Sequence, residues 1–128
     1  MERSTRDANK KTFSVSHWQM ISKEPDKIAK FYGDLFGWRF SDANGLGYRS
    51  LESAGDEGMD GGIWPAPPNG QEIVQLYIEV PDIDDALSRA QELGGSVVMK
   101  KQVLPDGDSM ALALDPLGRP FGLMTRKS

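Results

Sequence analysis

Two stretches of the chain carry apolar residues at the spacing of an α-helix. In the first, from about Pro25 to Phe36, the apolar stripe consists of Ile28, Phe31, Tyr32, Leu35 and Phe36. In the second, which begins after a capping aspartate at Asp82, it consists of Ile83, Ala86, Leu87, Ala90 and Leu93. Glycine follows both stripes, at Gly37 and at Gly94. We therefore predict two amphipathic helices whose stripes, Tyr32 and Phe36 included, pack into the core.

Each predicted helix is preceded by one strand pattern and followed by three shorter ones. Around the first helix the predicted strands are Phe13–Ile21, Trp38–Ser41, Gly47–Leu51 and Gly62–Trp64. Around the second they are Glu72–Val80, Val97–Lys100, Ser109–Leu114 and Phe121–Thr125. The two halves therefore share one order of elements, strand, helix and three strands.

The same order in both halves indicates an internal duplication. A single shift along the chain places Leu35 on Leu93, Gly37 on Gly95 and His17 on Gln75. Pro65 begins a Gly/Pro-rich stretch that separates the halves and continues neither a strand nor a helix. We predict one domain over residues 13–128, made of two βαβββ units at 13–65 and 71–126, after a disordered lead-in at 1–12.

Alternation along the leading strand of each unit predicts which side chains share a face. In the second unit Leu76, Ile78 and Val80 form an apolar face, and we expect it to pack under a helix. The opposite faces of the two leading strands are polar. Together with two residues of the later strands they predict a mixed aromatic and hydrogen-bonding pocket of His17, Gln19, Trp64, Gln75, Tyr77, Glu79 and Met124.

Composition narrows the classes of partner. The 128 residues include 15 basic and 19 acidic side chains, a net charge of −4, and lack a dense basic patch, which disfavours nucleic acid. No apolar run reaches the length of a membrane span, so no membrane partner is expected. The absence of cysteine excludes disulfides and thiolate metal sites and fits a cytoplasmic location.

Three segments resemble one known superfamily. They read HWQMI with FYGDLFGW, LYIEVPDIDDALSRAQELGGSVV, and ALDPLGRPFGLM. They resemble the vicinal oxygen chelate superfamily of glyoxalase I, extradiol dioxygenases and bleomycin-resistance proteins, and most closely its glyoxalase-like branch. The resemblance implies an α+β fold in which two tandem βαβββ units form an open, cup-shaped mixed β-sheet with helices on the outside. It also implies a homodimer, since members commonly dimerise.

The resemblance places four metal-ligand positions on His17, Gln75, Gly62 and Gly122. Only His17 is a strong ligand, whereas a stable divalent site usually needs three or four His, Cys or carboxylate ligands. A change of register would be needed to bring in Glu52 or Glu79, and for Glu79 the spacing argues against it. We therefore expect no metal and no other cofactor.

Three functions follow as hypotheses. The leading one is a small-molecule-binding glyoxalase-like protein with a degenerate metal site and an unknown organic ligand. The second is a lyase, isomerase or dioxygenase of the glyoxalase type, metal-dependent or metal-free, with His17 as base or metal ligand and Glu79 or Tyr77 as acid or base partner. The third is a non-catalytic interaction module whose cup is filled by side chains. His17 could also be a structural histidine on a half-buried strand.

Overall fold

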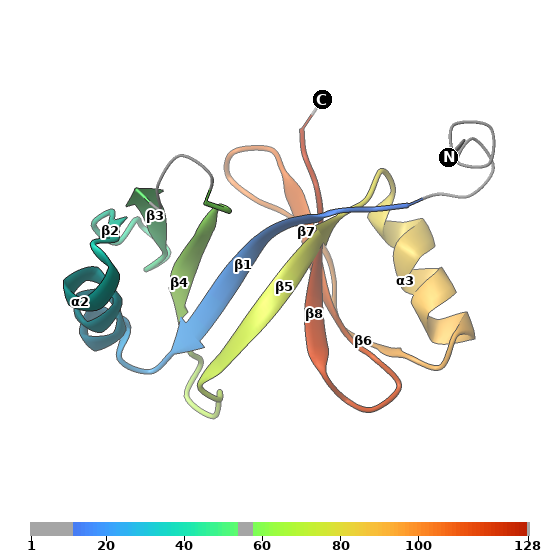
Figure 1. Cartoon of the computed structure of the whole chain (residues 1–128). Coiled ribbons are helices and arrows are strands. Elements are labelled where there is room, and N and C mark those ends of the chain that lie inside the picture. The colour runs from blue at the N-terminus through green and yellow to red at the C-terminus, as the bar shows by residue number, and fades with distance from the viewer. Residues whose placement is uncertain (1–11, 54–57, 128) are drawn as a thin grey trace, which may run out of the picture.

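The computed structural model describes residues 12–53 and 58–127, so the predicted lead-in lies almost wholly outside the described residues. The first unit consists of β1 (Val15–Ser22), α2 (Pro25–Phe36), β2 (Arg39–Phe40), β3 (Arg49–Ser53) and β4 (Gly61–Pro65). The second consists of β5 (Ile73–Glu79), α3 (Ile83–Glu92), β6 (Ser96–Val103), β7 (Ser109–Leu114) and β8 (Pro120–Thr125). Each strand and helix lies where the residue pattern predicts it, with small shifts at the ends (Figure 1).

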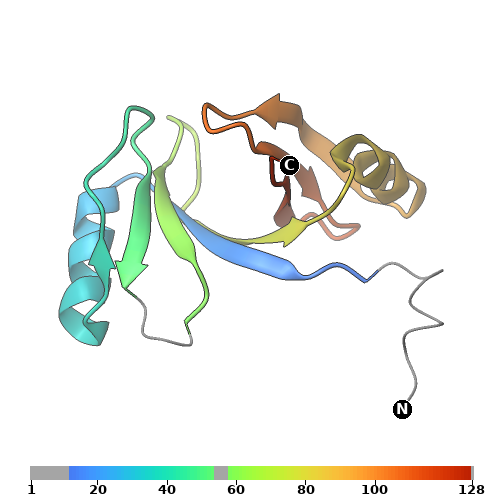
Figure 2. The same ribbon diagram turned by 90° about the horizontal axis from the view of Figure 1, so that it is seen from above.

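All the strands belong to one eight-stranded sheet of order β2-β3-β4-β1-β5-β8-β7-β6. Within each unit the first and last strands are parallel, β1 with β4 and β5 with β8. The units join where β1 and β5 pair antiparallel, with Gln19 opposite Gln75 and His17 opposite Tyr77. Seen from above, the sheet curls into an open cup, with α2 outside one end and α3 outside the other (Figure 2). The predicted α+β fold is confirmed.

A capping aspartate, a proline and a glycine determine where the helices begin or end. At the start of α3 the Asp82 carboxylate accepts a hydrogen bond from the Asp85 amide at 3.0 Å, which satisfies one of the unpaired donors of the first turn. Helix α2 starts with Pro25 and has no side-chain cap. It ends at Gly37, whose φ of 76° is a left-handed conformation that glycine adopts without strain.

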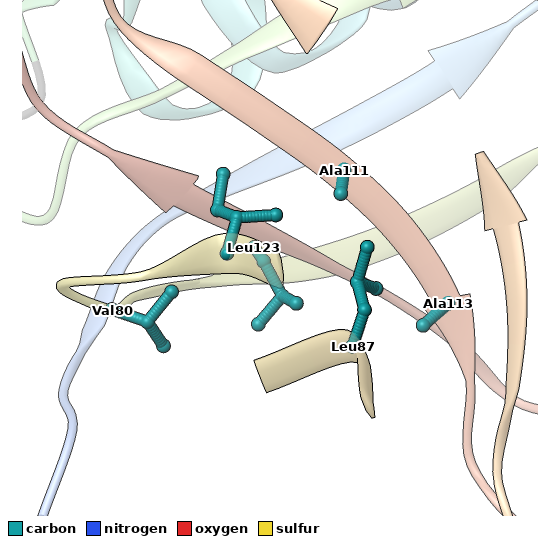
Figure 3. Close-up of a cluster of buried hydrophobic side chains, with 6 residues drawn as sticks. Val80, Leu87, Ala111, Ala113 and Leu123 are labelled. Atoms are coloured by element: carbon teal, nitrogen blue, oxygen red, sulfur yellow. The ribbon is translucent and has the colours of Figure 1, made fainter. Parts of the chain in front are cut away.

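The buried core lies in the second unit, between α3 and the outer face of the sheet. Six apolar residues form it, five of which are labelled in Figure 3: Val80, Ile83, Leu87, Ala111, Ala113 and Leu123. The small alanines of β7 let α3 approach the sheet closely, and Leu87 packs over them. The N-terminal part of the predicted apolar stripe of α3, with Ile83 and Leu87, is therefore buried in the core. Leu93, at the other end of the stripe, is 63% exposed.

The first unit is packed differently from the prediction. Helix α2 buries no residue fully, and Phe36 is 57% exposed, so its assignment to the core was wrong. The aromatic rings of this unit stack on one another instead, with Tyr32 and Phe36 both contacting Trp38 at centroid distances of 5.6 and 5.5 Å. This cluster lies at the C-terminal end of the helix, and Trp38 connects it to Trp18 of β1 at 5.6 Å.

The central part of the convex face is also uncovered. Leu76 was expected to lie under a helix but is 51% exposed, and Val74 is 62% exposed. The reason is the curvature of the sheet, which places the two helices over its outer ends and leaves β1 and β5 between them (Figure 1). None of the helices in residues 12–53 and 58–127 is long and apolar enough to span a bilayer.

Candidate functional site

A cavity of about 630 Å³ opens on the concave side of the sheet. Strands of both units and two loops, 44–48 and 104–108, surround it. Its walls are His17, Gln19, Asn44, Gly45, Leu46, Tyr48, Trp64, Tyr77, Leu104, Pro105, Asp106, Asp108, Ser109, Met110 and Met124. We refer to it below as the cup cavity.

Most of the predicted pocket residues lie in this cavity, and two do not. The walls include His17, Gln19, Trp64, Tyr77 and Met124. Gln75 shares their face of the sheet and is only 4% exposed, but it lies beneath the cavity rather than on its wall. Glu79 is at the end of β5, where its carboxylate pairs with Arg126 at 3.0 Å outside the cavity.

A β-bulge in β1 sets the surroundings of His17. The register between β1 and β5 shifts between Val15 and His17, and the extra residue of the bulge is Ser16. The Ser16 hydroxyl lies 2.8 Å from His17 Nδ1, and the imidazole stacks on the Tyr77 ring at 4.8 Å and 14°. Burial lowers the pKa of His17, helped by the nearby positive charge of Arg126, while Asp60 and Glu79 oppose the shift. The imidazole is therefore neutral at pH 7.

Two tyrosine rings cover two glycines at the floor of the cup cavity. Tyr77 of β5 lies over Gly122 of β8, and Tyr48 lies over Gly62 of β4. A Cβ at either glycine would lie closer than 3.0 Å to the ring above it. Glycine is therefore required at both positions so that the rings can lie flat against the sheet.

Both tyrosines are neutral hydrogen-bonding groups at pH 7. Burial raises the pKa of Tyr77 to about 12, with a smaller contribution from Tyr48. Burial also raises the pKa of Tyr48, although a hydrogen bond from the Gln19 amide opposes that shift. The two hydroxyl groups can donate hydrogen bonds to a ligand, and Tyr77 is a poor general base.

Two amide oxygens in the cup have no partner. Gln19 and Gln75 are 5% and 4% exposed, and the Oε1 atom of each is buried without a hydrogen bond from any residue in 12–53 or 58–127. They lie opposite each other in the β1–β5 pair. A buried carbonyl without a donor costs free energy, and such groups are normally satisfied by a water molecule or a ligand.

A glyoxalase-like domain family model matches residues 19–124. The chain belongs to this family. This confirms the resemblance inferred from the residue motifs. "Putative glyoxylase CFP32" of Mycobacterium tuberculosis, and the same-named protein of Mycobacterium bovis, are 34% identical to this domain over 101 residues, 73% of the chain. The chain spans 38% of the length of those relatives.

Solved structures share the fold of this glyoxalase-like domain at low sequence identity. A glyoxalase/bleomycin resistance protein/dioxygenase superfamily member from Vibrio splendidus aligns with a TM-score of 0.63 at 16% identity, covering 90% of this chain and 100% of the other. Methylmalonyl-CoA epimerase from Mycobacterium tuberculosis aligns with a TM-score of 0.64 at 16% identity, covering 89% and 88%. A hypothetical protein, BH1468 from Bacillus halodurans, reaches 0.66 at 13% identity, covering 92% and 97%.

The residues at the four metal-ligand positions of the superfamily do not fit a metal ion. His17 and Gln75 offer one imidazole and one neutral amide, while Gly62 and Gly122 offer no side chain and are covered by tyrosine rings. Glu52, the other carboxylate considered, lies exposed on β3. Within the described ranges, no group of three or more His, Asp or Glu side chains is placed to hold an ion. The tyrosines occupy the space that ligand side chains would need.

The residue pattern did not predict the part of the wall that comes from loops and from β7. Tyr48, Asp106 and Asp108 all line the cup cavity. Tyr48 was predicted to lie on a strand but precedes β3, and the two aspartates lie in the loop before β7. One signal was present, since two consecutive glycines inside the short strand that contains Gly62 indicate close approach of another group. That pattern does not identify Tyr48 as the group, because the contact depends on how the preceding loop folds.

Proposed function

We propose that this glyoxalase-like domain binds a small organic molecule in the cup cavity without using the superfamily's metal constellation. The observation that carries the proposal is Gln19, which lines a cavity of about 630 Å³ and whose buried Oε1 has no partner among the described residues. A volume of roughly 300–1,000 Å³ is typical of small-molecule sites. Trp64 and the two tyrosines supply flat apolar walls, and their polar ends supply oriented hydrogen bonds.

The open cavity counts against the alternative of a non-catalytic interaction module with a filled cup. In such a module the aromatic side chains would pack against one another across the cup. Tyr48 and Trp64 do contact each other, with ring centroids 4.6 Å apart. Both nevertheless line the remaining space, as do Tyr77 and Met124 from the other unit.

A fragment screen tests the proposal. Protein would be titrated with a library of small polar and aromatic compounds, followed by thermal shift and calorimetry. We expect saturable binding for some of them, and we expect Met110→Trp, which fills the cup cavity from β7, to abolish it. Met59→Trp is the matched control, because Met59 is 47% exposed and outside the cavity. If no compound binds saturably, or if both variants behave alike, the cup is not the site.

A second candidate function is metal-free proton transfer, and the state of His17 favours it. A neutral imidazole in a cavity can accept a proton, and the hydroxyl groups of Tyr48 and Tyr77 can donate hydrogen bonds to an oxygen that gains charge. Once a ligand is known, solvent deuterium exchange at its acidic C–H position provides the assay. His17→Gln should abolish the exchange while leaving binding within a few-fold.

We also propose a cytoplasmic homodimer that pairs through the convex face. Val74 and Leu76 of β5, with Phe31 and Leu35 of α2, are all more than half exposed. Large exposed apolar side chains gathered on one patch mark interaction sites, and a two-fold contact would bury the same residues on both copies. Light scattering should give twice the chain mass of 14.1 kDa, and Leu76→Glu should halve it. A monomer for the unmodified chain would contradict this proposal.

A further inference from the structure

The charge distribution around the cup cavity restricts the chemistry of its ligand. In the part of the chain that the structure describes, no lysine or arginine lines it, whereas Asp106 and Asp108 form part of one wall. His17, the one basic side chain on the wall, is uncharged at neutral pH because burial lowers its pKa. An anionic ligand would therefore find no positive partner on the described walls.

The positive charge of Arg126 is already paired with a carboxylate. Arg126 acts on His17 from outside the cavity, but its guanidinium pairs with Glu79 at 3.0 Å. Asp60 and Asp108 also stabilise the charge of Arg126. Arg126 thus faces three carboxylates, and the side chain of Lys127 lies close to Gly107, beside Asp106 and Asp108. The four carboxylates at this end of the cup outnumber these two cations, so the local field is negative.

The unpartnered amide of Gln19 indicates independently what the ligand must offer. Its Oε1 acceptor has no hydrogen-bond partner among the described residues, in a side chain that is only 5% exposed. An acceptor of this kind requires an N–H or O–H donor. The rings of Tyr48, Trp64 and Tyr77 present aromatic faces, which attract cations as well as flat apolar groups.

Resting on the proposed binding function, we propose that the ligand of the cup cavity is an organic cation, a protonated amine carried on a flat apolar body. Its ammonium group donates to Gln19 Oε1 and lies in the negative field of Asp106 and Asp108, while its body lies against the aromatic walls. Phosphate-bearing ligands such as CoA thioesters are disfavoured for this chain, because the described walls carry no lysine or arginine to pair with the phosphate charge.

Three probes with the same ring and different charge test this assignment. Calorimetry at pH 7 and low salt would compare 2-naphthylmethylamine, 2-naphthylmethanol and 2-naphthoate. We expect the amine to bind at least about tenfold more tightly than the carboxylate, with the alcohol between them. The preference should shrink in 0.5 M salt, because salt screens charge interactions.

Substitutions test which side chains cause the preference for the amine. Asp106→Asn with Asp108→Asn keeps the Oδ1 acceptors that the loop uses and removes both charges, so it should remove most of the preference for the amine. The control Asp34→Asn with Asp84→Asn removes the same charge from exposed helical positions and should leave the preference unchanged. Gln19→Met should weaken amine binding several-fold. Unchanged amine affinity in that variant would mean that a water molecule satisfies the carbonyl and would refute its role.

The two proposals fail in different ways. If none of the probes binds saturably, the binding function itself is contradicted. If the alcohol or the carboxylate binds as tightly as the amine, the cup binds small molecules but the assignment of an organic cation is wrong.

Discussion

The close approach of Tyr77 to Gly122 gives a quantitative prediction for Gly122→Ala. The new methyl group would lie closer than 3.0 Å to the Tyr77 ring. That ring has little freedom to move, because Tyr77 is 3% exposed and stacks on His17. Forcing one extra methyl group into such a contact costs about 1–3 kcal/mol. In a chain of this length each kcal/mol lowers Tm by roughly 3–6 °C.

Urea unfolding followed by circular dichroism measures this loss of stability. A double-mutant cycle tests whether the loss comes from the contact with the Tyr77 ring. In a Tyr77→Val background the ring is absent, so Gly122→Ala should then cost less than about 0.5 kcal/mol. Gly45→Ala is the control, because a Cβ there meets nothing within 4 Å, and we expect no measurable effect. An unchanged free energy of unfolding in Gly122→Ala, or an equal cost in both backgrounds, would refute the placement of the tyrosine over the glycine.

Three further predictions concern packing, capping and protonation. Leu87→Ala should lower the free energy of unfolding by about 2–5 kcal/mol, since Leu87 is 6% exposed in the core. The control Leu117→Ala, at a turn residue that is 87% exposed, should change it by less than about 0.5 kcal/mol. In the same urea assay Asp82→Ala should lower the free energy of unfolding by about 1 kcal/mol. Asp82→Asn should lower it much less, because asparagine keeps the capping oxygen that is bonded to the Asp85 amide. Equal losses in the two variants would contradict the cap. His17, the one histidine, should titrate below its ordinary pKa of 6.5 by proton NMR. Because the unfolded chain then binds the proton more readily, the stability that depends on neutral His17 should be complete above pH 6.5 and fall as the pH drops toward the folded-state pKa. His17→Gln should remove that dependence, and a midpoint at or above 6.5 would contradict the burial of the ring.

The residue pattern predicted the order of elements because periodicity is a local property. Alternation along β1 and β5 also placed His17, Gln19 and Tyr77 on the concave face, where they line the cup cavity. Alternation does not tell how far along a strand the cavity extends. Glu79 has the same orientation but lies at the strand end, where Arg126 from the C-terminal segment pairs with it.

The parts that were not predicted depend on long-range contacts. An apolar stripe at helical spacing is the same whether it faces a sheet or remains exposed, so the exposed Phe36 could not be distinguished from the buried Leu87. Tyr48 enters the cup from a loop, and its place over Gly62 requires that β3 pair with β4. The glycines at positions 62 and 122 were visible in the sequence, but the tyrosine rings that cover them were not.

The three tryptophan indoles provide the most direct test of the cup as a ligand site. Trp64 lines the cavity, whereas Trp18 and Trp38 contact each other at 5.6 Å on the side of the sheet that faces α2. In a proton–nitrogen NMR spectrum the chain gives three indole N–H signals, and Trp64→Phe assigns the relevant one. On titration with 2-naphthylmethylamine we predict a saturable shift of the Trp64 signal with little change in the other two. A Trp64 signal that does not move while the others do, or that moves no more than they do, would contradict the account.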